Sequence, residues 1–260
     1  MDSDGKFEAV AKLVNESERI LFITGAGIST DSGLPTYRGI GGLYEGRDTE
    51  DGIPIEEALS HSMMSSSPQV TWKYLWQIAE VSRGSKPNRG HEIIAQWMRK
   101  KPGSWILTQN VDGLHVAAFD SENVIEVHGR AENLYCMDCG KTESGEEVLF
   151  HSGRVKQPDP PICRECDGML RPDVVLFGEF LSDKSLDQMS QLQSAGIDLV
   201  VSIGTSSLFP YITGPVELAH EFGIPCAEIN PEETTVSRLC DYRLKETCTV
   251  ALEEIAKRIS

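Results

Sequence analysis

Four of the seven cysteines lie in two close pairs, Cys136-x2-Cys139 and Cys163-x2-Cys166, which are separated by 23 residues. Each C-x2-C knuckle turns two thiolates toward one point, and the loop between the knuckles can close a tetrahedral zinc site. Because four thiolates leave no open coordination position, a zinc ion here is expected to be structural. Four unrelated buried cysteines are the alternative. Cys226 lies in a predicted strand and is interpreted as a small core residue.

A glycine-rich turn follows the first apolar run of the chain. Gly25, Ala26 and Gly27 come directly after residues 20–24 and before a predicted helix. Glycines let the backbone approach a pyrophosphate, and the free N–H groups of a helix N-terminus favour an anion. The G-x-G-x-x-G pattern is incomplete because Thr30 occupies the third glycine position, so a tight turn without a ligand is an alternative.

A polar cluster follows a second apolar run. Gln109, Asn110 and Asp112 lie just beyond a predicted strand at 105–108. In open α/β sheets, residues beyond the carboxyl ends of parallel strands line the crevice in which ligands bind. Capping of a helix N-terminus would account for Asn110 or Asp112 alone, but not for all three residues together.

Two histidines are candidates for a general base. His128 follows another predicted strand, and the unperturbed pKa of histidine lies near neutral pH. His115 competes for the same role on the same evidence. A lone histidine is more often structural, so these residues alone do not separate a base from a packed side chain.

A sheet has to position these residues. The predicted strands are the apolar runs 20–24, 105–108, 124–127, 198–203 and 224–229. Strands that are apolar on both faces and separated by helical patterns indicate a parallel sheet covered on both sides. The expected fold class is therefore α/β, a Rossmann-like doubly wound parallel sheet, with helices predicted at 4–17 and 249–259.

Two stretches interrupt this pattern and are interpreted as insertions. Residues 39–90 are rich in Gly, Ser, Met and acids, with a helix predicted around 69–82, and residues 131–172 carry the cysteine pairs. The expected sheet domain is then discontinuous, formed by residues 1–38, 91–130 and 173–260. The two insertions are expected to form a smaller zinc-ribbon and helical domain.

The composition and charge of the chain limit the kinds of partner and the cellular location that we expect. The net charge of −16 argues against nucleic acid as a direct partner, since phosphate binding needs Lys and Arg on the binding face. It favours basic partners such as lysine-rich segments, although solubility alone would also explain it. No apolar run is long enough to span a bilayer, and the acidic N-terminus lacks the layout of a secretory signal. No membrane partner and a cytoplasmic location are therefore expected. The sequence leaves the oligomeric state open, with a monomer as the favoured state.

Taken together, these motifs resemble those of the sirtuin family, and the resemblance spans nearly the whole chain. The glycine-rich stretch through residue 38 resembles the family's cofactor loop, and residues 108–112 with His128 resemble its nicotinamide and catalytic motifs. The cysteine pairs follow the histidine, as in the family. The segments that resemble the substrate strand and the later cofactor contacts are 174–179, 204–206 and 229–231.

The resemblance implies NAD as co-substrate, one structural zinc ion per chain, and an acetyl-lysine protein or peptide as partner. His128 and Asn110 are the implied catalytic residues. The implied cofactor contacts are Gly25, Ala26, Gly27, Thr36, Tyr37, Arg38, Gln109, Asn110, Val111, Asp112, Gly204, Thr205, Ser206, Asn230 and Cys248. The implied contacts with a substrate added as a strand between residues 178–180 and 207–209 are Val175, Phe177, Gly178, Glu179, Phe180 and Leu208.

The implied reaction transfers the acetyl group to ADP-ribose. The acetyl-lysine oxygen attacks the ribose carbon as nicotinamide leaves, and His128 deprotonates the ribose hydroxyls so that the 2′ oxygen attacks the resulting alkylamidate. The products are free lysine, nicotinamide and O-acetyl-ADP-ribose. Protein ADP-ribosylation, a non-catalytic NAD or zinc interaction module, and a nucleic-acid-binding zinc ribbon are the alternatives.

The chain departs from the family pattern at positions that bear on specificity. Relatives that remove succinyl or malonyl groups carry a Tyr-x-x-Arg pair where this chain has Leu75 and Ile78. An acidic acyl group needs such a cation and hydroxyl in an apolar pocket, so acetyl or a longer neutral acyl group is expected. Tyr37 replaces the usual phenylalanine, and Leu176 stands where many relatives have tryptophan.

Overall fold

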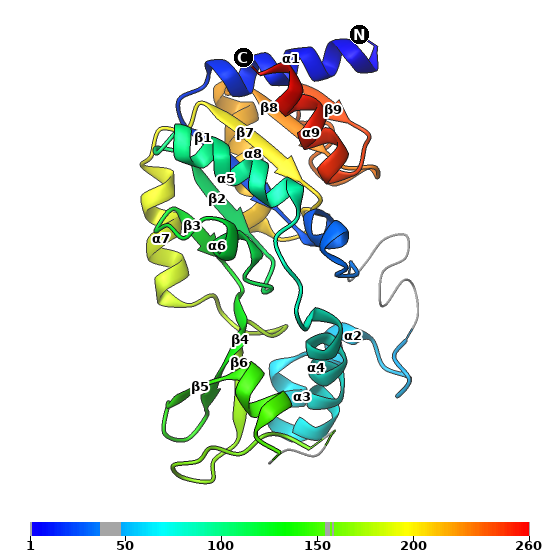
Figure 1. The fold of residues 1–260 in the computed structure, drawn as a ribbon, viewed down its shortest axis with the longest axis vertical. Coiled ribbons are helices and arrows are strands. Elements are labelled where there is room, and N and C mark those ends of the chain that lie inside the picture. Colours follow the sequence, from blue (N-terminus) through cyan, green and yellow to red (C-terminus); the bar gives the residue numbers. More distant parts are fainter. Residues whose placement is uncertain (1, 37–47, 154–156, 158, 260) are drawn as a thin grey trace.

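A computed structural model describes residues 2–36, 48–153, 157 and 159–259 (Figure 1). Its central sheet has six parallel strands in the order β3-β2-β1-β7-β8-β9. These strands are β1 (Ile20–Thr24), β2 (Trp105–Thr108), β3 (Val124–Glu126), β7 (Leu199–Ile203), β8 (Cys226–Ile229) and β9 (Tyr242–Leu244). The predicted parallel α/β sheet is confirmed, because five of the six strands coincide with the predicted runs.

Alternate residues of each strand face two apolar layers, one on each side of the sheet. In β1, Ile20 and Phe22 pack into one layer and Leu21 and Ile23 into the other, as the two-residue period of a strand requires. Cys226 is fully buried in the second layer, which confirms its interpretation as a core residue.

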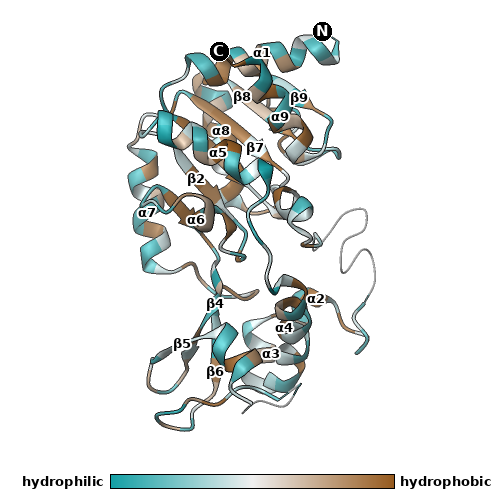
Figure 2. Ribbon diagram, viewed as in Figure 1, coloured by the Kyte–Doolittle hydropathy of each residue, from teal (hydrophilic) through white to brown (hydrophobic). Residues whose placement is uncertain are grey.

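Helices cover both layers. The first layer is covered by α1 (Ser3–Glu16), α5 (Arg89–Lys100), α6 (Leu114–Ala118) and α9 (Cys248–Arg258), and the second by α7 (Asp183–Gln193) and α8 (Pro210–Phe222). Figure 2 shows hydrophobic strands beneath helices that carry many hydrophilic residues. The two predicted terminal helices are confirmed to within one residue. None of the helices in the described ranges has the length and apolar character that a bilayer crossing needs.

The order of the sheet reverses beside β1, which places a ligand crevice there. From β1 the chain proceeds to β2 and β3 on one side, whereas β7 and β8 lie on the other. Ligands of open α/β sheets bind outside the carboxyl ends of the strands at such a reversal. The residues that follow β1, β2 and β7 therefore meet at one edge.

A second, smaller sheet lies beyond this edge (Figure 1). It is antiparallel, in the order β5-β4-β6. Its strands and the helices around it are β4 (Gly129–Cys136), β5 (Thr142–Ser144), β6 (Leu170–Val174), α2 (Ile55–Ala58), α3 (His61–Ser66), α4 (Pro68–Ser82) and the π-helix η2 (Glu147–His151). All of these elements except β5 contribute to a third apolar cluster, which includes Trp72, Trp76 and Leu170. The helix predicted around 69–82 is confirmed as α4.

Around the central sheet, two elements differ from the sequence-based expectation. The helix after the glycine-rich turn is a seven-residue 3-10 helix, η1 (Ala26–Ser32), which ends at Gly33 in a left-handed conformation. The edge strand β9 was not predicted, because it is only three residues long and only Leu244 of these is fully buried.

Candidate functional site

The glycine-rich turn packs directly against the residues that follow β7. A Cβ atom at Gly27 would lie 2.7 Å from the Cα of Gly204, and one at Gly25 would lie 2.7 Å from the Cα of Thr205. Gly204 has a φ of +58°, and a Cβ there would lie 2.7 Å from the Cys248 sulfur. The glycines are therefore required by the contact between two backbone turns, whatever ligand the site takes.

Two N–H groups of this turn are already hydrogen-bonded within the protein. Gly25 donates to the carbonyl oxygen of Ile203 at 3.1 Å, and Gly27 donates to that of Gly204 at 2.9 Å. A pyrophosphate at this edge would thus meet a backbone whose shape is fixed by β7 rather than a set of free donors.

The polar residues after β2 form one network with the turn. The Asn110 amide donates to the carbonyl oxygen of Gly25 at 3.1 Å and to the Ser29 hydroxyl at 3.2 Å. The Ser29 hydroxyl donates to Asp112 at 2.7 Å, and the other oxygen of Asp112 accepts from the N–H of Leu114 at 2.9 Å. The N-cap of α6 is Gly113, so Asp112 lies one residue before the cap and binds the first helical N–H while it also joins the site.

Two side chains tie the later segments to this network. The Gln109 amide donates to the Thr205 hydroxyl, and the Asn230 amide donates to the Thr205 carbonyl oxygen at 3.0 Å. Thr205 is buried, whereas Ser206 next to it is exposed. Gln109, Thr205 and Asn230, from three strand ends, therefore lie together.

A cavity of about 290 Å³ extends from this network toward the small sheet. Its polar wall includes Ser29, Asn110 and Asp112, and its apolar wall includes Leu75 and Ile78 of α4. Val111, Leu149 and Phe150 also line it. Both predicted acyl-selectivity residues therefore face the same space as the predicted nicotinamide contacts.

His128 lies at the same edge, half-buried. Its Nδ1 is 3.0 Å from the carbonyl oxygen of Gln109, so Nδ1 carries the hydrogen and donates it. Its Nε2 is 2.7 Å from the Tyr211 hydroxyl. Burial lowers the pKa of His128, although the hydrogen bond to Gln109 acts in the opposite direction. The ring is therefore neutral near pH 7, with its lone pair on Nε2.

His115, the competing candidate, lies inside the protein. Its Nε2 is 2.9 Å from the Thr24 hydroxyl, and its ring packs against His91 with a centroid distance of 4.8 Å. Burial, together with the nearby His91, holds the pKa of His115 well below its usual value. Its place in the core favours His128 as the base.

The predicted substrate segment carries exposed apolar side chains. Phe180 is 96% exposed, Leu208 49% and Phe177 36%. The backbone of Phe177 is already paired, since its N–H donates to Leu59 and its carbonyl oxygen accepts from His61. An added peptide strand would therefore have to use residues 178–180 rather than Phe177.

Glu179 of this segment points inward rather than toward a substrate. Its carboxylate accepts hydrogen bonds from Arg171 at 2.6 and 2.9 Å and from the N–H of Leu176 at 2.9 Å. Burial acts to raise the pKa of Glu179, but the hydrogen bonds from Arg171, Leu176 and His61 lower it to about 2. Glu179 thus fixes the shape of the loop that ends in Phe180.

The remaining predicted contacts lie at the edges of the site or outside the described residues. Val175 donates its N–H to the carbonyl oxygen of His128 at 2.9 Å, which ties the substrate segment to the base. Thr36 ends the described part of the cofactor loop, and Tyr37 and Arg38 lie outside the described residues. Ala26 lines the cavity, and Gly178 adopts a φ of +83°.

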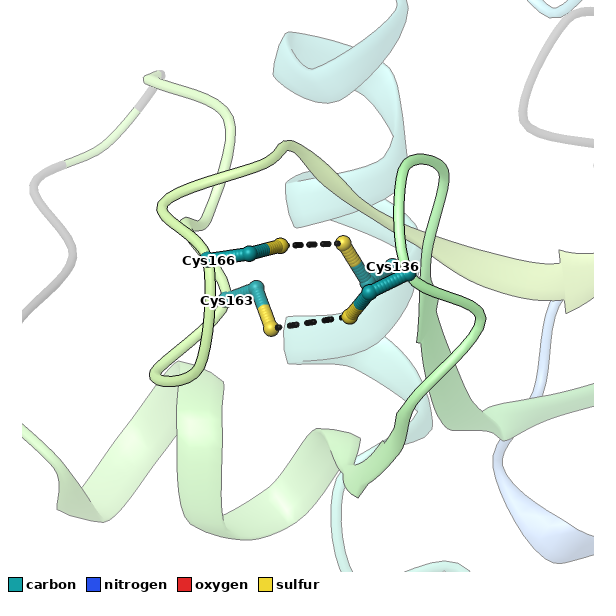
Figure 3. A group of neighbouring side chains, drawn as sticks. Cys136, Cys163 and Cys166 are labelled. Atoms are coloured by element: carbon teal, nitrogen blue, oxygen red, sulfur yellow. Dashed lines mark hydrogen bonds between the residues drawn. The ribbon is translucent and has the colours of Figure 1, made fainter.

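The four paired cysteines converge at the end of the small sheet (Figure 3). Their sulfur atoms lie within 4.8 Å of one another, with 3.5 Å between Cys136 and Cys166 and 3.8 Å between Cys139 and Cys163. Zn–S bonds of about 2.3 Å in a tetrahedron separate the sulfurs by about 3.8 Å, so this donor set fits one structural zinc ion.

The sequence did not single out Tyr211, which contacts His128 from the first turn of α8. Its place right after Pro210 was a signal only for a helix start, and nothing in the pattern relates it to a residue 83 positions earlier.

Comparison with known proteins agrees with this geometry. Residues 25–209 match the Sir2 family. The chain is 43% identical over 260 residues to NAD-dependent protein deacylase 2 of Pseudomonas aeruginosa, covering 100% of this chain and 99% of that protein. It is 44% identical over 250 residues to the protein of the same name from Pseudomonas syringae pv. tomato, covering 96% and 98%.

A solved structure is also similar over nearly the whole length. It is described as Sir2 with a deacetylated p53 peptide and 3′-O-acetyl ADP-ribose, and it matches with a TM-score of 0.85 at 27% identity. The match covers 98% of this chain and 99% of that one. On the family match, the identities and the common fold, this chain belongs to the Sir2 family, the sirtuins.

Proposed function

We propose that this chain is an NAD-dependent protein-lysine deacylase, which transfers an acetyl group from lysine to ADP-ribose and releases nicotinamide and free lysine. The observation that carries the proposal is the state of His128. Its Nδ1–H donates to Gln109, so that Nε2, at the ligand edge of the sheet, is the basic nitrogen. Relatives named NAD-dependent protein deacylase support the same reaction class.

The residues at the sheet edge suit a dinucleotide. When bound, NAD supplies the electrophilic ribose carbon and the sugar hydroxyls that take up the acyl group. The backbone of Gly25, Ala26 and Gly27 would approach its phosphates, since the two glycines let this turn pack against Gly204 and Thr205, and Ser206 lies beside them. The residues proposed to hold the remaining parts of NAD are Thr36, Tyr37, Arg38, Gln109, Asn110, Val111, Asp112, Gly204, Asn230 and Cys248.

Asn110 and Asp112 suit the recognition of a carboxamide. The Asp112 carboxylate accepts hydrogen bonds and lines the cavity, and the N–H of the backbone beside it is a donor, so the two together complement an amide. The Ser29 hydroxyl holds this carboxylate in place at 2.7 Å and is itself held by the Asn110 amide at 3.2 Å. Asn110 is the residue proposed to position the ribose and a water.

His128 acts as the general base. Its neutral Nε2 accepts a proton from a ribose hydroxyl, which makes that oxygen nucleophilic toward the acyl carbon. Since Nδ1–H keeps its bond to Gln109 throughout, the imidazolium that forms is stabilised by a carbonyl dipole. Water is kept from the ring on one side by Phe209, whose ring lies edge-on to it at 5.5 Å.

The acyl group is proposed to be acetyl or a longer neutral chain. Leu75 and Ile78 present hydrocarbon to the cavity, and a carboxylate buried against them would lack a partner. The Arg83 guanidinium at this cavity lies 4.4 Å from the Phe150 ring centroid and pairs with Glu146 at 3.3 Å, so its charge is already partly compensated.

The peptide partner is proposed to add as a strand between residues 178–180 and 207–209. The exposed side chains of Phe180 and Leu208 offer apolar contacts on the two sides of such a strand. The site would then lie between two domains, a sheet domain of residues 1–38, 91–130 and 173–260 and a small domain of 39–90 and 131–172. The separate apolar clusters of the two sheets support this division.

The test is incubation of the chain with NAD and an acetylated peptide, read by mass spectrometry. We expect free lysine peptide, nicotinamide and O-acetyl-ADP-ribose in equal amounts, whereas ADP-ribosyl transfer would leave added mass on a protein. His128→Ala should abolish turnover and leave NAD binding measurable by calorimetry. His151→Ala, at an exposed histidine of η2, is the matched control. Full activity of the His128 variant would assign the base to another residue.

A further inference from the structure

The imidazole of His128 is held by two residues of the segment after β7. Its Nε2 is 2.7 Å from the Tyr211 hydroxyl, and its ring lies edge-on to Tyr211 and Phe209, with centroid distances of 5.8 and 5.5 Å. Phe209 and Tyr211 stack on each other at 5.3 Å with an interplanar angle of 8°. The ring of the base is thus fixed by a pair of parallel aromatic rings and by one hydroxyl.

The direction of the hydrogen bond between Tyr211 and Nε2 follows from the contact that Nδ1 makes on the other side of the His128 ring. Nδ1 faces a carbonyl oxygen, which only accepts, so Nδ1 carries the hydrogen. In a neutral imidazole Nε2 then has the lone pair, and Tyr211 must donate to it. A hydrogen bond of this kind favours the neutral form of histidine over the protonated form.

We propose that Tyr211 is a positioning residue for His128, whose hydroxyl holds the lone pair of Nε2 in place and keeps the base neutral. The inference rests on the proposed deacylase function only for its consequence in turnover. The hydrogen bond itself belongs to the free protein and is measurable there.

The groups around His128 leave Tyr211 as its one titratable contact among the described residues. Glu126 and Arg130, two residues before and after it, pair with each other at 2.6 Å, and Asp173 lies opposite Arg130 on β6. From the turn after β2 the ring meets the backbone carbonyl of Gln109, and from the start of α8 it meets Phe209 and Tyr211. The ring itself has no ion pair in the part of the chain that the structure describes.

Turnover requires the Tyr211 hydroxyl to break its hydrogen bond to the lone pair of His128 Nε2. An sp² nitrogen has one lone pair, so a ribose hydroxyl can pass its proton to Nε2 only after the Tyr211 hydrogen has turned away. The O–H bond of the ribose then breaks, the Nε2–H bond forms, and the phenol keeps its own proton. Burial raises the pKa of Tyr211 to about 12, so the phenol remains a donor throughout the working pH range.

The test is an NMR titration of the histidines in the NAD-free protein, comparing wild type with Tyr211→Phe. The signal of His128 among the six histidines is identified by its absence in His128→Ala. Phenylalanine keeps the stacked ring and removes only the hydroxyl, so we expect the pKa of His128 to rise by about 0.5 to 1 unit. Tyr242→Phe, at the edge strand β9, is the control and should leave this pKa unchanged.

A change smaller than about 0.2 units in a folded Tyr211→Phe protein would overturn the inference, given the scale of a net hydrogen bond. Wild-type protein supplies a second measurement that needs no variant, since long-range ¹⁵N–¹H spectra report which nitrogen carries the proton. A hydrogen on Nε2 rather than Nδ1 of neutral His128 would also overturn it.

The pH profile of deacylation separates the two proposals. The acid limb of kcat/KM in Tyr211→Phe should move to higher pH by the same amount as the NMR pKa. An NMR shift in a protein that does not deacylate would support the positioning role and reject the deacylase. Deacylation with no NMR shift would support the deacylase and reject the positioning role of Tyr211.

Discussion

The Ser29 hydroxyl donates a 2.7 Å hydrogen bond to the Asp112 carboxylate and so joins the turn after β1 to the turn after β2. The same hydroxyl accepts from Asn110 at 3.2 Å. Asp112 is therefore oriented before any ligand arrives, and its second oxygen is held by the N–H of Leu114. Such preorganisation lowers the entropic cost of binding a polar group at this point.

Ser29→Ala is expected to weaken the binding of NAD about ten- to a hundredfold, because the loss of one hydrogen bond to a charged group costs about 1.5–3 kcal/mol. Calorimetric titration with NAD measures the effect. Thr30→Ala removes a hydroxyl that, among the described residues, bonds to the carbonyl oxygen of Gly27 on the exposed side, and serves as the control. Equal affinities in the two variants would show that Ser29 does not orient the site.

Gly27→Ala is expected to destabilise the protein by about 1–3 kcal/mol, because its Cβ would meet the backbone of Gly204 at 2.7 Å and force two strand ends apart. Gly214→Ala in α8 is the matched control, since nothing lies within 4 Å of a Cβ there. Alanine suits a helix interior better than glycine by up to about 1 kcal/mol. The unfolding temperature should therefore fall in Gly27→Ala and rise in Gly214→Ala, relative to wild type. An unchanged unfolding temperature of Gly27→Ala would contradict the packing argument.

The sequence predicted the sheet better than the site, for a physical reason. Strands such as β1 are buried on both faces and read as continuous apolar runs, whereas β9 at the edge has two partly exposed residues and lacks that pattern. The small sheet was not predicted either. Its β6 contains Pro172 and Asp173, and its pairing with β4 shifts register between Arg130 and Leu134.

The site contacts depend on distances that a sequence does not contain. The approach of Gly27 to Gly204 joins the turns that follow β1 and β7, and the contact of His128 with Tyr211 joins the end of β3 to α8. Residue types at strand ends suffice to predict which edge binds a ligand. They do not predict that the N–H of Gly27 is already used by the protein, since this follows from the pairing of the strands.

Acidification below pH 6.5 is expected to destabilise the fold. Burial lowers the pKa of His91 to about 4 and holds that of His115 well below its usual value. The unfolded chain therefore binds more protons than the folded one, so stability is complete above about pH 6.5 and is lost as the pH falls. Denaturant unfolding between pH 7 and pH 4.5 should show a loss on the order of a few kcal/mol.

His115→Gln tests the source of this loss. The amide keeps a hydrogen-bonding group near Thr24 but does not titrate, so the dependence of stability on pH should become less steep. His151→Gln, at an exposed histidine, should keep the wild-type slope. The same slope in both variants would place the acid sensitivity elsewhere.

Cys163→Ser is expected to reduce bound zinc from one ion per chain to nearly none and to lower the unfolding temperature, because metal binding at a thiolate site is coupled to folding. The measurement is zinc by plasma mass spectrometry together with a thermal melt. Cys240→Ser is the control, since this thiol lies 3.1 Å from Cys226 and apart from the four-cysteine cluster. A metal-free Cys163 variant as stable as wild type would refute a structural role for zinc.

Acyl preference depends on the apolar wall of the cavity. Leu75 and Ile78 offer no cation or hydroxyl, so removal of succinyl from a given peptide should be at least about tenfold slower in kcat/KM than removal of acetyl. Replacing both residues, as Leu75→Tyr with Ile78→Arg, adds the missing hydroxyl and cation. This variant should raise desuccinylation relative to deacetylation by about tenfold or more.

Arg83 is the competing cation, and it provides the control. Its guanidinium stacks on Phe150 and pairs with Glu146, and both contacts would have to loosen before it could bind a carboxylate. Arg83→Ala should therefore leave the ratio of desuccinylation to deacetylation unchanged. If wild type removed succinyl faster than acetyl and Arg83→Ala lost that advantage, the selectivity would lie with Arg83 instead of the apolar wall. The charge of this one arginine would then outweigh the hydrocarbon of Leu75 and Ile78.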